Sequence, residues 1–168
     1  GLASAFPAGM QAGILLMAAS KRPLWETPFL PYLYLFTGIL AAMGVYGIVL
    51  SRSKASYEKN LPLLSSMIYY GLYLVIISAL TTVAHLVAVE APGAVLTLFA
   101  NPFPLAAPTF LIGYILVGLT FPAAHAYVAY TAREPLSRNI MLRFFISLIV
   151  GAVAVRASFL YAGQLYFI

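Results

Sequence analysis

The chain has 168 residues, of which 63% are hydrophobic and 8% are charged, and its formal net charge is +5. Its mean hydropathy of +0.98 is typical of an integral membrane protein. Because there is no cysteine, this chain can hold no disulfide, no cysteine-ligated iron–sulfur cluster and no cysteine-ligated zinc. The basic residues fall mostly in polar breaks between apolar runs, so the charge indicates membrane topology and not nucleic-acid binding.

Five apolar runs predict an all-α fold, a polytopic bundle of transmembrane helices that takes up the whole chain, 1–168. A membrane-spanning helix needs about 20 apolar residues, and the predicted spans are 2–20, 28–50, 61–89, 108–131 and 138–164. No internal repeat and no soluble domain are visible. The chain begins without Met inside an apolar run, so we expect a longer protein that continues upstream.

Local signals mark the ends of these spans. Gly9 and Gly13 have the small-xxx-small spacing that lets helices approach closely. Residues suited to helix capping precede three spans: Thr27 followed by Pro28, Asn60, and Ser137. The connection 90–104 is long, rich in proline and weakly polar, so we expect it to lie along the membrane interface or against a partner.

The basic residues of the breaks predict the topology. Two lie in breaks on one side, Lys21 and Arg22, and five lie on the other, Arg52, Lys54, Lys59, Arg133 and Arg138. The side with more basic residues is normally cytoplasmic, so the C-terminus is predicted to be non-cytoplasmic in a multi-pass plasma-membrane protein. An aromatic belt on that outer side would contain Trp25, Tyr32, Tyr34 and Tyr166.

The last predicted span carries one full charge in its interior, Arg156. Arg143 lies thirteen residues earlier, about 20 Å along a helix, so it can reach one interface while Arg156 remains inside. A charge at that depth costs about 2.5 kcal/mol or more unless it faces protein or water. All four glutamates fall in polar breaks. Arg156 is therefore either held by helix carbonyls or is a functional cation beside a redox cofactor or a proton path.

Counting residues from the span ends places several polar side chains at one depth, in the outer half of the membrane. The main candidates are Gln11, His85 and Arg156, with Thr37, Thr81 and Tyr114 as additions. Such groups must be satisfied by one another, by water or by a ligand. The layer predicts either polar contacts that hold the helices together or a site for a ligand or a proton path.

His125 is a secondary candidate at a different depth, about 25 Å from the outer end of its span. His85 and His125 are thus near opposite faces and cannot ligate the same haem iron. Pro122 removes a helix hydrogen bond to the carbonyl of Gly118, which predicts a kink.

Three stretches carry a family resemblance: RASFLYAGQL at 156–165, GILLMAASKRPLWETPFLPYLYLFTGILAA at 13–42 and KNLPLLSSMIYYGLYLVIISAL at 59–80. They resemble the NrfD/PsrC-like membrane subunits of nitrite and polysulfide reductases. Those proteins usually have eight helices in two four-helix bundles. The resemblance implies that this chain corresponds to helices four to eight of such a protein, that is, to the second bundle plus one helix of the first.

The resemblance implies a quinone-interacting subunit of a respiratory oxidoreductase, which is not a complete enzyme by itself. Such subunits exchange electrons between menaquinone or ubiquinone and a docked ferredoxin-like iron–sulfur subunit, which serves a molybdopterin or haem catalytic subunit. Gln11 occupies the position of a family tyrosine in helix four, since QAG replaces YTG. An amide can donate a hydrogen bond to a quinone carbonyl, but it cannot act as a phenolic acid.

The resulting hypothesis assigns quinone binding or a proton path to Gln11, His85 and Arg156, and partner docking to Lys21, Arg22 and Trp25. Neither haem nor an iron–sulfur cluster is expected to be held by this chain. Two alternatives remain open. One is an ion-translocating or transporter subunit, which Arg156, His125 and the Pro122 kink would suit. The other is a purely structural membrane anchor in contact with lipid.

Overall fold

The computed structural model describes residues 2–18, 22–99, 105–132 and 136–165. Within these ranges all regular structure is helical, which confirms the all-α prediction. The elements are α1 (Leu2–Ala18), α2 (Phe29–Leu50), α3 (Lys54–Lys59), α4 (Leu61–Ala88), α5 (Pro92–Leu96), α6 (Ala106–Pro108), the π-helix η1 (Thr109–Thr120), α7 (Phe121–Thr131) and α8 (Arg138–Leu165).

In the described part of the chain, four helices are long and apolar enough to cross a membrane. They are α2, α4, the continuous helix Ala106–Thr131 formed by α6, η1 and α7, and α8. The first predicted span forms the helix α1, but its 17 residues are fewer than the roughly 20 needed for a hydrocarbon core. A membrane span at 2–20, and with it a total of five spans, therefore remains a prediction.

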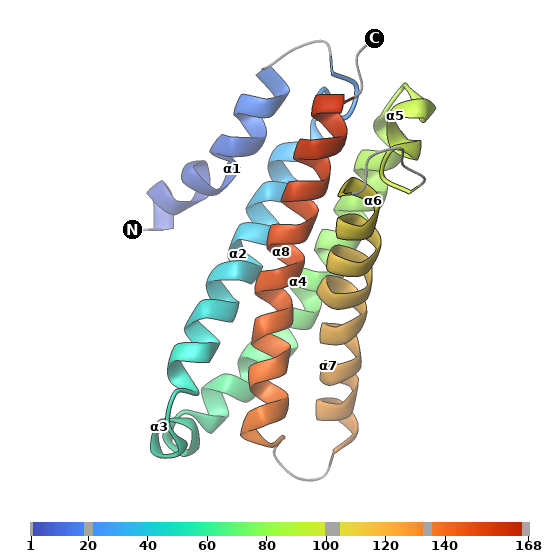
Figure 1. The fold of residues 1–168 in the computed structure, drawn as a ribbon. Helices are drawn as coiled ribbons and strands as arrows, with labels where there is room; N and C mark the ends of the chain where they lie inside the picture. Colours follow the sequence, from blue (N-terminus) through green and yellow to red (C-terminus); the bar gives the residue numbers. More distant parts are fainter. Residues whose placement is uncertain (1, 19–21, 100–104, 133–135, 166–168) are drawn as a thin grey trace.

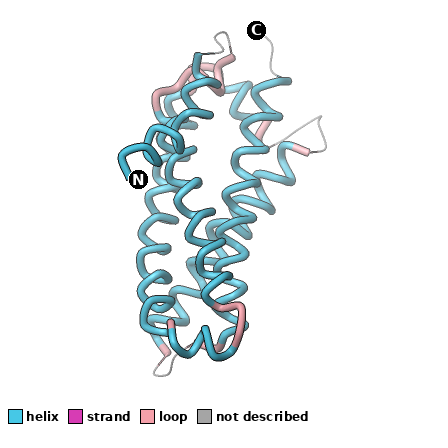
Figure 2. Tube along the Cα trace, turned by 90° about the vertical axis from the view of Figure 1, so that its left-hand side faces the viewer, coloured by secondary structure: helices cyan, strands magenta, loops and turns pink. Residues whose placement is uncertain are grey.

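The four long helices pack side by side as a bundle, and α1 lies outside it against α2 (Figures 1 and 2). Small residues bring α1 and α2 together, because a Cβ atom at Gly13 would lie 2.6 Å from the Cα atom of Pro31. The bundle has two ends. The α5 end carries α5, residues 22–28 and the C-terminal turns of α8, and the α3 end carries α3 (Figure 1).

Two of the capping predictions are wrong. Helix α2 has Pro28 at its N-cap position without a side-chain cap, and the Thr27 hydroxyl instead contacts His85. Asn60 directly precedes α4, but its side-chain amide donates back to the carbonyl of Ser56 at 2.8 Å. Asn60 does so because the break after α2, which was treated as a loop in the sequence, contains the short helix α3, and Asn60 is the C-cap residue of that helix.

At the α3 end, side chains tie α8 to the end of α2 and to α3. Arg138 donates from Nε to the carbonyl of Ser51 at 2.8 Å and from Nη2 to the carbonyl of Arg52 at 2.9 Å. The Tyr57 hydroxyl donates to the carbonyl of Leu136. Desolvation and the neighbouring Glu58 raise the pKa of Tyr57, so this hydroxyl keeps the proton that it donates.

A kink was predicted at Pro122, and the structure instead has a change of helical winding just before it. The backbone N–H of Phe121 donates to the carbonyl of Leu116, five residues earlier, and the Thr120 hydroxyl donates to the carbonyl of Ile115 at 2.9 Å. This wider winding ends where α7 begins, with Pro122 in the first turn. The proline thus marks a change from π to α winding, in a helix that was expected to be α throughout.

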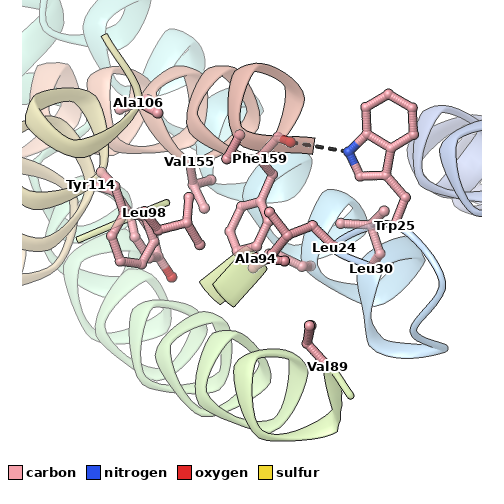
Figure 3. Packing of buried hydrophobic residues seen from close by; sticks show 14 of the residues in the cluster. Leu24, Trp25, Leu30, Val89, Ala94, Leu98, Ala106, Tyr114, Val155 and Phe159 are labelled. Carbon is pink, nitrogen blue, oxygen red and sulfur yellow. Dashed lines mark hydrogen bonds between the residues drawn. The ribbon is translucent and has the colours of Figure 1, made fainter. Parts of the chain in front are cut away.

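The connection after α4 covers the end of its own bundle. Ala94 in α5 and Leu98 just after it are completely buried, together with Leu24 and Phe159 (Figure 3). The described part of 90–104 thus packs against its own bundle, where the sequence predicted contact with the membrane interface or with a partner. Leu96, at 59% exposed, points away from this core.

Residues 22–25 clamp the C-terminal turns of α8. Trp25 donates from Nε1 to the carbonyl of Phe159 at 3.0 Å (Figure 3), and Arg22 donates from Nη1 to the carbonyl of Gly163 at 3.0 Å. The last carbonyls of a helix lack intrahelical partners, so the arginine satisfies one of them. The predicted aromatic belt is only partly possible. Trp25 and Tyr34 are each only 5% exposed, so neither belongs to such a belt. Tyr32 is exposed, and Tyr166 lies outside the described residues.

The contact between residues 22–25 and α8 explains the alanine and the glycine of the AGQ sequence in the last span. Ala162 is completely buried, and a Cβ atom at Gly163 would lie 2.0 Å from Nε1 of Trp25. Glycine is thus needed for the indole to reach α8. Gln164 is exposed, so the described contacts of the motif come from its first two residues.

We expect Gly163→Ala to destabilise the protein by about 1–3 kcal/mol, the usual effect of overpacking a buried contact. The added methyl group must displace the Trp25 indole from the Phe159 carbonyl. Thermal unfolding of the purified protein in detergent, followed by circular dichroism, measures the loss. Gln164→Ala serves as the matched control and should leave the midpoint unchanged; equal midpoints for the two variants would contradict this account of the clamp.

Candidate functional site

Arg156 lies on α8 and is held by the first turns of α2. It donates from Nη2 to the carbonyl of Tyr34 at 2.7 Å and from Nε to the hydroxyl of Thr37 at 3.3 Å. Its Cζ atom lies 5.3 Å from the centre of the Tyr34 ring, a cation–π distance. A helix carbonyl and an aromatic ring thus take the place of a carboxylate.

Helix α2 is shaped to receive this guanidinium. A Cβ atom at Gly38 would lie 2.9 Å from Nη2 of Arg156, so any larger residue would crowd the cation. Thr37 is 1% exposed, and its hydroxyl donates to the carbonyl of Leu33 at 2.8 Å. Because that hydroxyl hydrogen is used within α2, the Thr37 oxygen accepts from Arg156.

Arg156 also lines a groove of about 340 Å³ between α1, α2 and α8. The other lining residues are small or apolar: Gly9, Ala12, Leu35, Gly38, Ile39 and Ala42. A guanidinium has five N–H donors. Among the described residues two of them are used, and three remain on a side chain that lines this apolar groove.

His85 makes a second polar site near the α5 end. It is completely buried, its Nδ1 lies 2.5 Å from the hydroxyl oxygen of Thr27, and its ring packs edge-on against Phe159 at 4.7 Å. The backbone of Leu24 also lies close enough to interact with the ring. Within the described residues, however, Nε2 has no hydrogen bond of normal length.

A third polar group joins α4 to η1. The hydroxyl oxygen of Tyr114 lies 2.6 Å from that of Thr82 and 3.2 Å from that of Ser78, and all three side chains are buried. Tyr114 thus joins the polar layer, as expected. Thr81 does not, because it faces outward and donates to the carbonyl of Ile77; Thr82, one residue later, was missed although it lies on the His85 face of the same helix.

The predicted layer therefore divides into separate contacts. Arg156 binds α2, and His85 binds the segment before α2; no hydrogen bond joins them in the described part of the chain. Gln11 is apart from both. Gly9 and Gly13 face α2, and at 100° per residue Gln11 points to the opposite side of α1, where it is exposed.

His125 is half-buried near the middle of α7 and lies far from these groups in the sequence. Its Nδ1–H donates to the carbonyl of Phe121 at 2.7 Å, and its ring lies 5.9 Å from the Phe121 ring. These contacts lie within one helix, which fits a local structural role.

The residues predicted to dock a partner are used largely within the chain. Trp25 is buried in the clamp, and Arg22 is half-buried, with its Cζ atom 4.6 Å from the Trp25 ring centre. Burial removes the indole from any docking surface, which corrects that part of the prediction. Lys21 lies outside the described residues.

The described residues contain no group of three or more His, Cys, Asp or Glu side chains placed to hold a metal ion. No protein-family model, curated protein or solved structure matches this chain. The function of the chain is therefore inferred from its own groups, chiefly Arg156 and the groove beside it.

We expect Gly38→Ala to push the guanidinium of Arg156 off the Tyr34 carbonyl and to destabilise the fold by about 1.5–3 kcal/mol, the range for a hydrogen bond to a charged group. A double-mutant cycle tests the mechanism. Gly38→Ala should lower the unfolding midpoint in the wild-type chain and have little effect in Arg156→Gln. Equal losses in both backgrounds would show that the methyl group acts elsewhere.

Proposed function

We propose that this chain is a quinone-interacting membrane subunit of a respiratory oxidoreductase, of the NrfD/PsrC-like kind. The observation that carries the proposal is an arginine at membrane depth with three spare N–H donors on the wall of an apolar groove. A quinone has an apolar ring that suits such walls and carbonyl oxygens that accept hydrogen bonds. Bound there, it would supply the redox chemistry that this chain lacks.

The arginine's role follows from its charge. Negative charge develops on a quinone oxygen when electrons arrive, and fixed donors in a site of low dielectric stabilise developing charge strongly. The guanidinium is already held by α2, so little reorganisation is needed. His85 contacts Thr27 and Phe159 in another part of the bundle, so it does not share this role.

The proposal includes a five-span arrangement in which α1 corresponds to the last helix of a first bundle. The exposed face of α1, with Gln11, Ile14 and Leu15, would then pack against helices upstream in the same protein or in a partner. Gln11, on the side of α1 away from the groove, would then belong to this contact and not to the quinone site.

The docking surface for an iron–sulfur subunit is proposed at the α5 end. Trp25 is replaced in this role by exposed residues of the covering segment, Leu96 at 59% and Phe99 at 41%. Electrons would pass from a quinone near Arg156 to the docked subunit, which delivers them to a molybdopterin or haem enzyme, or in the reverse direction.

The first test is turnover. We expect Arg156→Gln to assemble normally but to slow quinone-linked electron transfer at least tenfold, about 1.4 kcal/mol of barrier. Arg156→Leu should be slower still, because it also leaves the Tyr34 carbonyl without its donor. Steady-state quinol oxidation by the purified complex gives the rates, with Arg143→Gln, an exposed arginine on the same helix, as the control.

Unchanged turnover in fully assembled Arg156→Gln would mean that the arginine is a structural strut. The chain would then be better described as a membrane anchor.

The second test is topology, with the α5 end and the C-terminus proposed to be non-cytoplasmic. The chain has no cysteine, so single cysteines can be introduced directly. Glu90, between α4 and α5, and Lys54, in α3, are suitable because both side chains are exposed, at opposite ends of the bundle. A membrane-impermeant thiol reagent should label Glu90→Cys in intact cells and not Lys54→Cys; the reverse pattern would invert the topology.

A further inference from the structure

A polar pocket of about 380 Å³ lies at the α5 end, between residues 23–27 and the end of α4. Its lining includes the carboxylates of Glu26 and Glu90 and the side chain of Thr27. Both glutamates are exposed, whereas Thr27 is 3% exposed. The threonine is thus the inner wall of an acidic, water-accessible pocket.

His85 is buried next to Thr27, on the side away from the pocket. The Thr27 hydroxyl oxygen lies 2.5 Å from Nδ1, while Nε2 is buried without a hydrogen bond of normal length among the described residues. Packing alone is served better by an apolar side chain, because a buried polar atom without a partner costs about 1–3 kcal/mol. An imidazole with one nitrogen coupled to a hydroxyl and the other buried without a hydrogen bond of normal length can take up a proton on one side and release it on the other.

Polar groups continue inward along the same face of α4. Ser78, Thr82 and His85 are spaced i, i+4 and i+7, and all three are buried. Tyr114 bridges the hydroxyls of Thr82 and Ser78. Thr82 and His85 are one turn apart, a gap that a single bound water can bridge. From the end of α4 to Ser78 is about 15 Å, half of a hydrocarbon core.

We infer that Thr27 and His85 form the inlet of a proton path that leads from the acidic pocket to Tyr114, midway through the bundle. In each passage the Thr27 oxygen takes a proton from pocket water and gives its own proton to Nδ1 of His85. The imidazolium then releases the Nε2 proton inward through bridging water to Thr82 and Tyr114. The ring is then neutral in the Nδ1–H tautomer, so one proton has entered and one has left. The reverse passage, or rotation of the ring, restores the Nε2–H tautomer before another proton enters.

The inlet deepens the proposed function, because quinone reduction consumes protons and quinol oxidation releases them. Its existence can nevertheless be tested without any quinone. The chain has two histidines and one tryptophan, so ¹⁵N labelling of these residues in the full-length chain in lipid nanodiscs gives few signals. Exchange of the His85 imidazole proton with water is the quantity measured by NMR.

The Trp25 indole N–H is an internal standard, because it is also buried and bonded, to the Phe159 carbonyl. We expect the His85 proton to exchange with water at least tenfold faster than the Trp25 proton in the wild type. Thr27→Val, which removes the hydroxyl with little change of shape, should slow His85 exchange at least tenfold, and Thr27→Ser should restore it. His125, bonded only within α7, should be unaffected.

The inference is overturned if His85 exchanges no faster than Trp25, or if folded Thr27→Val and Thr27→Ser exchange alike. If the Thr27→Val variant does not fold, the comparison of His85 and Trp25 proton exchange in the wild-type chain still tests the inference. A second arm uses the intact complex, where Tyr114→Phe should slow proton release at least tenfold without weakening quinone binding. Rapid His85 exchange together with no quinone binding would refute the proposed function and leave the inlet standing.

Discussion

The structure depends on how a guanidinium is accommodated several turns inside an apolar helix bundle without a carboxylate. Arg156 uses the Tyr34 carbonyl and the Thr37 hydroxyl as acceptors. Gly38 leaves room for the guanidinium there, because a Cβ atom at this position would lie 2.9 Å from Nη2. Because these acceptors belong to α2, the arginine fixes α8 against α2 at that depth. It also leaves part of its donor capacity facing a groove, so a single interaction both holds the two helices together and defines the candidate ligand site.

The α5 end shows a different solution to the same problem of polar groups in an apolar setting. The backbone carbonyls of the last α8 turns are satisfied by Trp25 and Arg22 from the segment before α2, while Thr27 in that segment contacts His85. One short stretch thereby connects α8, α4 and the α5 covering. The polar pocket of Glu26 and Glu90 opens beside this stretch, at the same end of the bundle.

The Arg156 groove and the buried contacts of His85 are thus separated in space. The groove lies between α1, α2 and α8. His85 packs against Phe159 of α8 and lies on the same face of α4 as Thr82, whose hydroxyl contacts that of Tyr114 in η1. A reaction that moves electrons and protons benefits from such separation, since the proton donor need not occupy the place where the electron carrier binds. Phe159, three residues after Arg156, packs against the imidazole, so the two regions share a wall on α8.

The sequence alone predicted the features that composition and helical period control: the all-α fold and the long apolar helices, five in the prediction, of which the described residues contain four. Those features depend on hydrophobicity and on a rise of about 1.5 Å per residue, which neighbours do not alter. Only the tertiary structure decided the partners. Thr27 was predicted to cap α2 and instead contacts His85, Thr81 was chosen where Thr82 faces inward, and Trp25 is packed inside the clamp. Rotation about the helix axis and the path of the connections set these contacts. In a chain apolar on nearly every helix face, hydropathy carries little information about either.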